Sequence, residues 1–347
     1  MSSTLVAGQI VPAVTGKSWS DFIRERIFTP LGMSNSNTSI KDFRPNGDIA
    51  IPHAREEGKQ LRPIRYMTAD NLAPAGAINS SVNDMAKWII LQLDNGLMRG
   101  SVPERRLFSV RQSREMWTPQ TITPSGDPPP GLEALKSNFS AYGLGWGLTD
   151  YRGRKIVSHT GGLAGLVSRV TLVPDLKLGI VVLTNQEAGG AFQAITYHVL
   201  DSILDAGAND WIAAFRAAAE RGLARAAEAE KKQGSNRNAD SKPSLPQSKY
   251  AGTYNDAWYG EIALVEENGH LVFHAPRAPI LTGDLEHWQY DTFVVRWRDR
   301  TLLADAFVTF ALKPDGSIDH FKMQAVSPLT DFSYDFQDLN FTPSVKK

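Results

Sequence analysis

The sequence contains no cysteine and no excess of charge of either sign. The absence of cysteine among its 347 residues excludes disulfide bonds, thiolate nucleophiles and cysteine-ligated zinc. The 37 Lys and Arg residues balance 37 Asp and Glu residues, so no global field favours nucleic acid or an anionic membrane. No apolar run is long enough to span a bilayer. We therefore expect a protein with no nucleic-acid partner and no membrane span.

Length and composition indicate a folded chain with two domains. Apolar residues make up 42% of the sequence and charged residues 21%, which is the balance of a packed globular protein. We predict a first domain at residues 1–207, a helical and flexible linker at 208–246 and a small antiparallel β domain at 247–347. The N-terminal residues lack the basic and long apolar segments of a signal peptide, so the sequence leaves the compartment open.

Helical periodicity gives way to β-rich runs within the first domain. Apolar spacing predicts a helix at residues 18–33 that ends near Gly32. Ser81 can cap a second helix by accepting from the Asp84 N–H, and Asn95-Gly96 ends it. The remaining elements predicted there are a short apolar run at Ile156-Val157, strands at Val167–Val173 and Leu178–Thr184, and a helix at Gly189–Leu204.

The C-terminal third changes from helix to short strands. Residues 210–232 predict a connecting helix, and residues 233–247 contain almost no apolar residues, which is typical of a flexible linker. Turns at Asn268-Gly269 and Pro314-Asp-Gly316 join runs that alternate at period two. The predicted fold is a small antiparallel barrel or sandwich. Four aromatic residues are assigned to its core in preference to a ligand pocket: Trp258, Tyr259, Trp288 and Tyr290.

Four short motifs, in order, resemble the β-lactamase-like serine hydrolases, which include class C β-lactamases, DD-peptidases, D-aminopeptidases and esterases. They are Val14-Thr-Gly-Lys-Ser-Trp19 with Pro30-Leu-Gly-Met33, Ala73-Pro-Ala-Gly76 with Asn79-Ser-Ser81, Tyr142-Gly-Leu-Gly-Trp146, and His159-Thr-Gly-Gly162. The resemblance implies an α/β fold of the α+β type, in which helices flank an antiparallel sheet. Here that sheet is expected to be incomplete and to be followed by a small all-β, barrel-like (lipocalin-like) domain.

The resemblance also implies nucleophilic catalysis through an acyl-serine. In this family a Ser-x-x-Lys helix supplies the nucleophile and a Tyr-x-Asn loop handles the proton. A Lys-Thr-Gly or His-Thr-Gly strand faces them, and His159-Thr160-Gly161 matches it. His159 would then be an electropositive group, Thr160 a hydrogen-bonding side chain and Gly161 a point of close ligand approach, while the Gly162 N–H would donate to the oxyanion. The expected substrate is a small molecule or peptide with a carbonyl or carboxylate.

Both earlier motifs of the family are missing from the sequence. In the family they precede the stretch that matches Leu5-Val-Ala-Gly8, and here only Met1 to Thr4 precede it. The single Ser-x-x-Lys spacing is Ser344 to Lys347, and Tyr-x-Asn does not occur. We therefore expect the C-terminal portion of a hydrolase that is inactive alone. The alternatives are a binding or regulatory remnant that holds a carboxylate or carbonyl ligand, and assembly with a separate chain that carries the missing motifs.

The missing segment is expected to leave one edge of the sheet exposed. Two further sequence patterns, a phosphate-loop-like motif and a pair of histidines, are better explained as ordinary surface residues than as binding sites. Without neighbouring strands, Gly179–Thr184 would form an exposed apolar sheet edge that promotes self-association. Thr15-Gly-Lys-Ser18 resembles a phosphate loop, but Val11 occupies the position that needs glycine. His270 and His274 lie four residues apart in a predicted strand, about 13 Å, which is too far to share a metal. We expect no metal and no organic cofactor.

Overall fold

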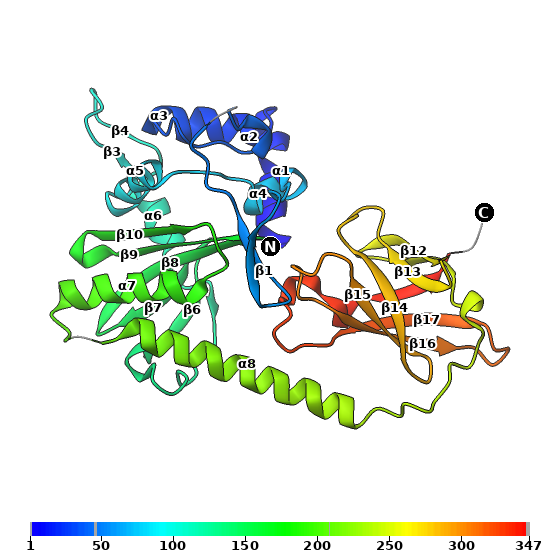
Figure 1. The fold of residues 1–347 in the computed structure, drawn as a ribbon. Helices are drawn as coiled ribbons and strands as arrows, with labels where there is room; N and C mark the ends of the chain where they lie inside the picture. Colours follow the sequence, from blue (N-terminus) through cyan, green and yellow to red (C-terminus); the bar gives the residue numbers. More distant parts are fainter. Residues whose placement is uncertain (1, 45–46, 208, 345–347) are drawn as a thin grey trace. The chain divides into compact units, whose positions relative to one another are not determined.

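The computed structural model describes residues 2–44, 47–207 and 209–344 and is drawn in Figure 1. Its chain divides into two units. The first unit comprises the residues up to Ala54 together with Leu61–Ala219. The second unit comprises Arg55–Gln60 together with the residues from Glu220 onward. Each unit has its own sheet system and its own hydrophobic core.

The first unit contains a six-stranded antiparallel sheet with the order β10-β9-β8-β7-β6-β5. The predicted strands at 167–173 and 178–184 are confirmed, and the apolar run at Ile156-Val157 is part of a strand of 10 residues. The strands are β5 (Thr121–Ile122), β6 (Ser140–Tyr142), β7 (Gly147–Tyr151), β8 (Arg154–Leu163), β9 (Leu166–Val173) and β10 (Leu178–Thr184). Four other strands form two-stranded sheets: β3 (Leu97–Met98) pairs with β4 (Arg105–Arg106), and β1 (His53–Glu56) pairs with β2 (Gln60–Pro63) where the chain crosses between the units.

Local capping residues set the helices of the first unit. The Ser81 hydroxyl accepts from the Asp84 N–H as predicted, and the Ser18 hydroxyl accepts from the Asp21 N–H in the same way. Gly32 ends its helix at φ 64°. The helices are α1 (Ser2–Thr15), α2 (Trp19–Ile23), a π-helical turn (Arg24–Phe28), α3 (Thr29–Leu31), α4 (Ala73–Gly76), α5 (Val82–Leu93), α6 (Val110–Met116) and α7 (Gly189–Leu204). A further helix, α8 (Trp211–Ser235), begins in the first unit and continues into the second. Short 3-10 turns lie at Ile40–Asp42, Asp70–Leu72, Glu133–Leu135 and Pro174–Leu176.

Helices cover both faces of the sheet, and strand alternation explains how. Ile156 packs in the cluster that contains Phe192 of α7, whereas its neighbour Val157 packs in the cluster that contains Ile89 of α5. Successive side chains of a strand point to opposite faces, so α7 covers one face and α5 the other (Figure 1). Gly179 permits the close approach of α5, because a Cβ there would lie 2.0 Å from Cγ2 of Ile89.

Strand β10 lies at one end of the sheet, as the sequence predicts. Its strand partner among the described residues is β9, with a register from Leu178↔Val173 to Thr184↔Val167. Beyond its end, Gln186 forms an isolated parallel bridge with His53. Leu183 remains 37% exposed on this strand. An unpaired edge with exposed apolar side chains offers free backbone groups to another strand.

The second unit contains a closed eight-stranded antiparallel barrel, in which β18 pairs with both β11 and β17. The barrel-like prediction is confirmed. Asn268 and Gly269 have φ values of 52° and 80°, which is the left-handed geometry that a two-residue hairpin requires. The strands are β11 (Gly252–Asp256), β12 (Gly260–Glu267), β13 (His270–His274), β14 (Thr282–Gln289), β15 (Thr292–Trp297), β16 (Ala306–Leu312), β17 (Ile318–Ala325) and β18 (Asn340–Pro343).

Aromatic residues fill the barrel, but several of them are not the predicted ones. Trp258 and Tyr290 are 68% and 57% exposed, so their assignment to the core is wrong. Both lie at turns, where the chain turns away from the interior. Trp288 contacts Phe307 edge to face outside the core cluster, whereas Tyr259 packs against the core as predicted. The buried aromatic residues are Tyr250, Tyr254, Phe273, Phe293, Trp297, Phe310, Phe321, Phe336 and Phe341.

Residues 237–244, expected to be flexible, are hydrogen-bonded to the turn between β14 and β15. The Arg237 guanidinium lies 4.7 Å from the centroid of the Trp288 ring. The Asn238 N–H donates to Oε1 of Gln289 at 2.8 Å, and the Ser244 hydroxyl donates to Asp291 at 2.7 Å. These partners are distant in sequence, so polar composition alone did not reveal the contact.

Candidate active site

Strand β8 extends beyond its neighbour β7 but stays paired with its other neighbour, β9. Its pairing with β7 stops at Gly147↔Ser158, whereas its pairing with β9 continues to Leu163↔Leu166. The chain enters β7 through a turn in which the Gly143 N–H donates to the Trp146 carbonyl at 2.7 Å. Four consecutive residues of β8 past this point are exposed: His159, Thr160, Gly161 and Gly162. The four predicted site residues therefore share one open strand edge.

His159 contacts a tyrosine that the sequence reasoning gave no role. Its Nε2 lies 3.0 Å from the hydroxyl of Tyr142, and the ring centroids are 6.3 Å apart in a T-shaped arrangement. Burial raises the pKa of the Tyr142 phenol above its usual value. Tyr142 belongs to one of the four family motifs, so the sequence marked its position. Only the fold showed that its hydroxyl reaches His159.

The two glycines of the motif have different surroundings. A Cβ on Gly161 would lie 2.6 Å from the Ser168 hydroxyl of β9, whereas a Cβ on Gly162 would meet open space. Gly161 was expected to permit close ligand approach, and the structure gives a nearer reason for glycine there, the Ser168 side chain. Residues i and i+2 of a strand share a face, so Ser168, opposite Gly161, lies on the face of His159.

A buried positive charge lies across the strand from Thr160. Thr160 pairs with Arg169 of β9, and directly opposite residues of an antiparallel pair share a face. Arg169 is 8% exposed; its Nε donates to the Thr171 hydroxyl at 3.0 Å, and its guanidinium lies 5.9 Å from the Tyr197 ring centroid. Burial lowers the pKa of Arg169 from its usual value, but a guanidinium stays charged at neutral pH. The motif thus lies beside a fixed cation.

The other chemistry-bearing residues lie elsewhere. Within the described ranges no group of three or more His, Asp or Glu residues is arranged to hold a metal ion. His274 instead pairs with Glu267 at 2.8 Å. Ser344 follows β18 in the second unit, and the Ser-x-x-Lys spacing it starts ends at Lys347, outside the described residues. No helix of the described residues is long and apolar enough to cross a membrane.

Two surface hollows are lined by residues outside this strand edge. One of about 360 Å³ lies beside Arg24, Gly32 and Ser36, and another of about 540 Å³ lies on the barrel beside Lys249 and Glu261. The lining of neither includes any residue of the His159–Gly162 stretch. The candidate site is thus an open strand edge with polar side chains, and the chemistry of its residues identifies it better than the size of a cavity.

Several known proteins are similar in sequence. An unguisins hydrolase of Aspergillus violaceofuscus is 27% identical over 305 residues, which cover 79% of this chain and 50% of that protein. Another, from Aspergillus campestris, is 30% identical over 205 residues, 58% of this chain and 36% of that protein. Penicillin-binding protein 4 of Amycolatopsis lactamdurans is 27% identical over 192 residues, 54% and 46%. The chain therefore matches half or less of the length of each of these relatives.

Solved structures and family models also align with this chain. The octameric penicillin-binding protein homologue from Pyrococcus abyssi aligns at TM-score 0.48 with 18% identity, over 96% of this chain and 62% of that chain. D-amino acid amidase from Ochrobactrum anthropi SV3 aligns at TM-score 0.40 with 24% identity, over 52% and 46%. A domain of unknown function (DUF3471) matches residues 236–343. The Beta-lactamase family model matches residues 1–204, more than half of the sequence, and the chain therefore belongs to the Beta-lactamase family.

Proposed function

We propose that this chain supplies the substrate-orienting wall of a serine hydrolase that cleaves an ester or an amide. The observation that carries the proposal is the exposed stretch from His159 to Gly162 on β8, past the end of β7. A substrate carbonyl placed at this edge is within reach of the His159 side chain and the backbone N–H of Gly162, and Thr160 lies between them on the strand. Such preorganised donors stabilise the oxyanion that forms when a serine attacks the carbonyl carbon.

The serine and its base are proposed to come from outside the 347 residues. In the reaction, the serine oxygen bonds to the carbonyl carbon, the alcohol or amine departs with a proton, and water then hydrolyses the acyl-serine. Ser-x-x-Lys spacing occurs in this sequence only at residues 344–347, and Tyr-x-Asn does not occur. The chain by itself is therefore expected to bind substrate-like ligands without turning them over.

Replacing His159 by alanine is expected to weaken binding of N-acetyl-D-alanine, which carries both a carbonyl and a carboxylate, about tenfold or more. A hydrogen bond to a charged group contributes about 1.5–3 kcal/mol. Binding is followed by NMR titration of the full chain. The matched control is His198→Ala, because His198 is exposed on α7 of the same unit. Equal weakening by both variants would argue against the proposal, as would the absence of binding to the wild type.

A chemical probe tests where the nucleophile lies. Incubation of the chain with a fluorophosphonate is expected to leave every serine unlabelled, because no Ser-x-x-Lys pair adjoins His159. Mass spectrometry of the intact protein reads out the result. Stoichiometric labelling of a serine would place a nucleophile in the chain and contradict this part of the proposal.

A second candidate function is a non-catalytic binding module. It is favoured by the same two features, accessible donors at His159–Gly162 and the absence of the nucleophile motifs. Adding a separate polypeptide that bears Ser-x-x-Lys and Tyr-x-Asn distinguishes the two candidates. Restored hydrolysis of p-nitrophenyl acetate that depends on His159 supports the hydrolase, whereas persistent ligand binding without hydrolysis supports the binding module.

We also propose that the free edge of β10 mediates self-association. Substituting Leu183, which is 37% exposed on this strand, by lysine is expected to shift the protein toward the monomer, since a charged edge residue opposes strand pairing. Size-exclusion chromatography with light scattering, over a range of concentrations, measures the effect. Wild-type protein that remains monomeric at every concentration would rule the proposal out.

A further inference from the structure

The backbone of Tyr142 is paired on both sides beside the motif. It ends β6, where it pairs with Thr121 of β5 on one side and with Gly147 of β7 on the other. Its carbonyl also accepts from the Gln120 N–H at 2.9 Å. Gly147 in turn pairs with Ser158, the residue before His159. The backbone register therefore places Tyr142 beside the start of the open edge of β8, where its hydroxyl reaches the imidazole.

The contact between the two side chains involves one nitrogen of the imidazole. The phenol oxygen lies 3.0 Å from Nε2 of His159, within hydrogen-bond range. The phenol keeps its proton at neutral pH, because burial raises the pKa of Tyr142 above its usual value. Among the described residues, Nε2 of His159 is the hydrogen-bond partner of this hydroxyl. A phenol that donates to Nε2 requires that nitrogen to be unprotonated.

We propose that Tyr142 is a positioning residue that donates to Nε2 of His159 and so holds the neutral imidazole in its Nδ1–H tautomer. The hydrogen bond made by one ring nitrogen decides which nitrogen carries the proton. The Nδ1–H group is then the donor that His159 presents to the carbonyl or carboxylate of a ligand along β8. This role in ligand binding rests on the proposed function, whereas the tautomer itself does not.

The first test reads the tautomer directly on the full chain. Nitrogen-15 NMR is recorded at a pH high enough that the His159 shifts no longer change, and His159→Gln assigns its signals among those of the seven histidines. We expect Nδ1 to show the protonated, pyrrole-type shift and Nε2 the pyridine-type shift. In Tyr142→Phe the proton should move largely to Nε2, the nitrogen that a free imidazole prefers. An Nε2–H tautomer in the wild type overturns the inference.

The second test measures the consequence for binding. Tyr142→Phe keeps the ring and removes the hydroxyl, and it is expected to weaken N-acetyl-D-alanine binding about three- to tenfold. The control is Tyr66→Phe, since the Tyr66 hydroxyl donates to a backbone carbonyl, that of Ala50, at 3.2 Å and not to an imidazole. Unchanged affinity in Tyr142→Phe overturns the positioning role.

The two tests separate this inference from the proposed function. If the wild type has the Nδ1–H tautomer but binds no ligand, the proposed function fails and the tautomer assignment stands. If His159→Ala weakens binding but the wild type has the Nε2–H tautomer, the proposed function stands and the role of Tyr142 fails. The wild-type spectrum needs no substitution at position 142, so a misfolded variant cannot leave the inference undecided.

Discussion

Replacing Asp201 by alanine is expected to lower the free energy of unfolding of the first unit by about 3–5 kcal/mol, because removal of one member of a buried ionic cluster leaves its partners uncompensated. The Asp201 side chain is 5% exposed. Its carboxylate accepts from Tyr151 at 2.5 Å and from Asn209 and Trp211 at 2.8 Å each. Nε of Arg152 lies 3.2 Å away. Thermal unfolding followed by tryptophan fluorescence measures the loss.

The same carboxyl makes a prediction about acid stability. Burial alone would raise the pKa of Asp201, but hydrogen bonds from Tyr151 and its neighbours outweigh burial and leave the pKa below its usual value. A lowered folded-state pKa stabilises the fold above the unfolded-state pKa of about 3.9. That stabilisation is lost as the pH falls through the folded-state pKa. Below about pH 4 the wild type should therefore lose stability more steeply than Asp201→Ala.

The control is an exposed carboxylate in the same unit. Asp175 pairs with Arg154 at 2.7 Å, and both side chains are nearly half exposed. Asp175→Ala should change the free energy of unfolding by less than about 1 kcal/mol. Comparable losses in the two variants would contradict the role given to the buried cluster around Asp201.

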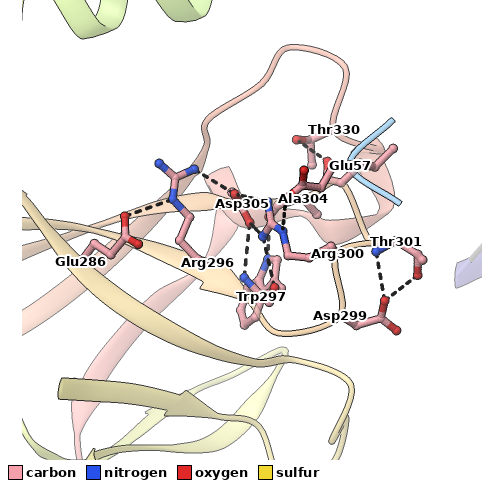
Figure 2. Close-up of polar contacts among 11 residues, drawn as sticks. Glu57, Glu286, Arg296, Trp297, Asp299, Arg300, Thr301, Ala304, Asp305 and Thr330 are labelled. Carbon is pink, nitrogen blue, oxygen red and sulfur yellow. Dashed lines mark hydrogen bonds and ion pairs between the residues drawn. The ribbon is translucent and has the colours of Figure 1, made fainter. Parts of the chain in front are cut away.

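Replacing Asp305 by alanine is expected to destabilise the second unit by a similar amount, about 3–5 kcal/mol. Figure 2 shows its carboxylate between two arginines at the loop that joins β15 and β16. Arg300 donates to it at 2.7 and 3.0 Å, and Arg296 donates at 2.8 Å. The Trp297 N–H also donates, at 3.3 Å. The Asp305 side chain is 12% exposed, so both arginines would lose a nearly buried partner.

Burial alone would raise the pKa of Asp305, but hydrogen bonds from Arg300 and Arg296 outweigh burial and hold the pKa below its usual value. Calorimetry of two variants distinguishes the loss of this buried carboxylate from the loss of any carboxylate of the barrel. The matched control is Asp319→Ala in the same barrel, because Asp319 is half exposed and pairs with His320 at 2.9 Å. Asp305→Ala should lower the melting temperature of the barrel and Asp319→Ala should leave it nearly unchanged. The reverse order would refute the assignment.

Much of the local structure followed from the sequence. Ser81 caps its helix as predicted, because capping depends on residues only three positions apart. The hairpin at Asn268-Gly269 formed for the same reason, since its left-handed backbone suits those two residues. The sequence alone also identified the stretch from His159 to Gly162, because four consecutive residues of one strand are neighbours without any tertiary contact.

Tertiary structure decided the features that depend on distant partners. Residues 237–244 are polar and read as a linker, yet they bond to residues about 50 positions away on the barrel. In β16 the buried side chains include Val308 and Phe310, whereas Phe307 is half-buried and Thr309 is exposed. A one-residue choice of register reverses the two faces of a strand, and this strand has apolar residues on both.

The candidate site shows the same division. Sequence motifs selected His159, Thr160 and Gly162, but the Tyr142 hydroxyl reaches the imidazole at the edge that opens where the pairing of β7 with β8 stops, at Ser158. The reason for glycine at Gly161 likewise appeared only when β9 brought Ser168 against it. The sequence by itself determined which residues carry the chemistry, because backbone propensity and motif order are local. The fold decided which side chains face them, because strand pairing joins residues that the sequence separates.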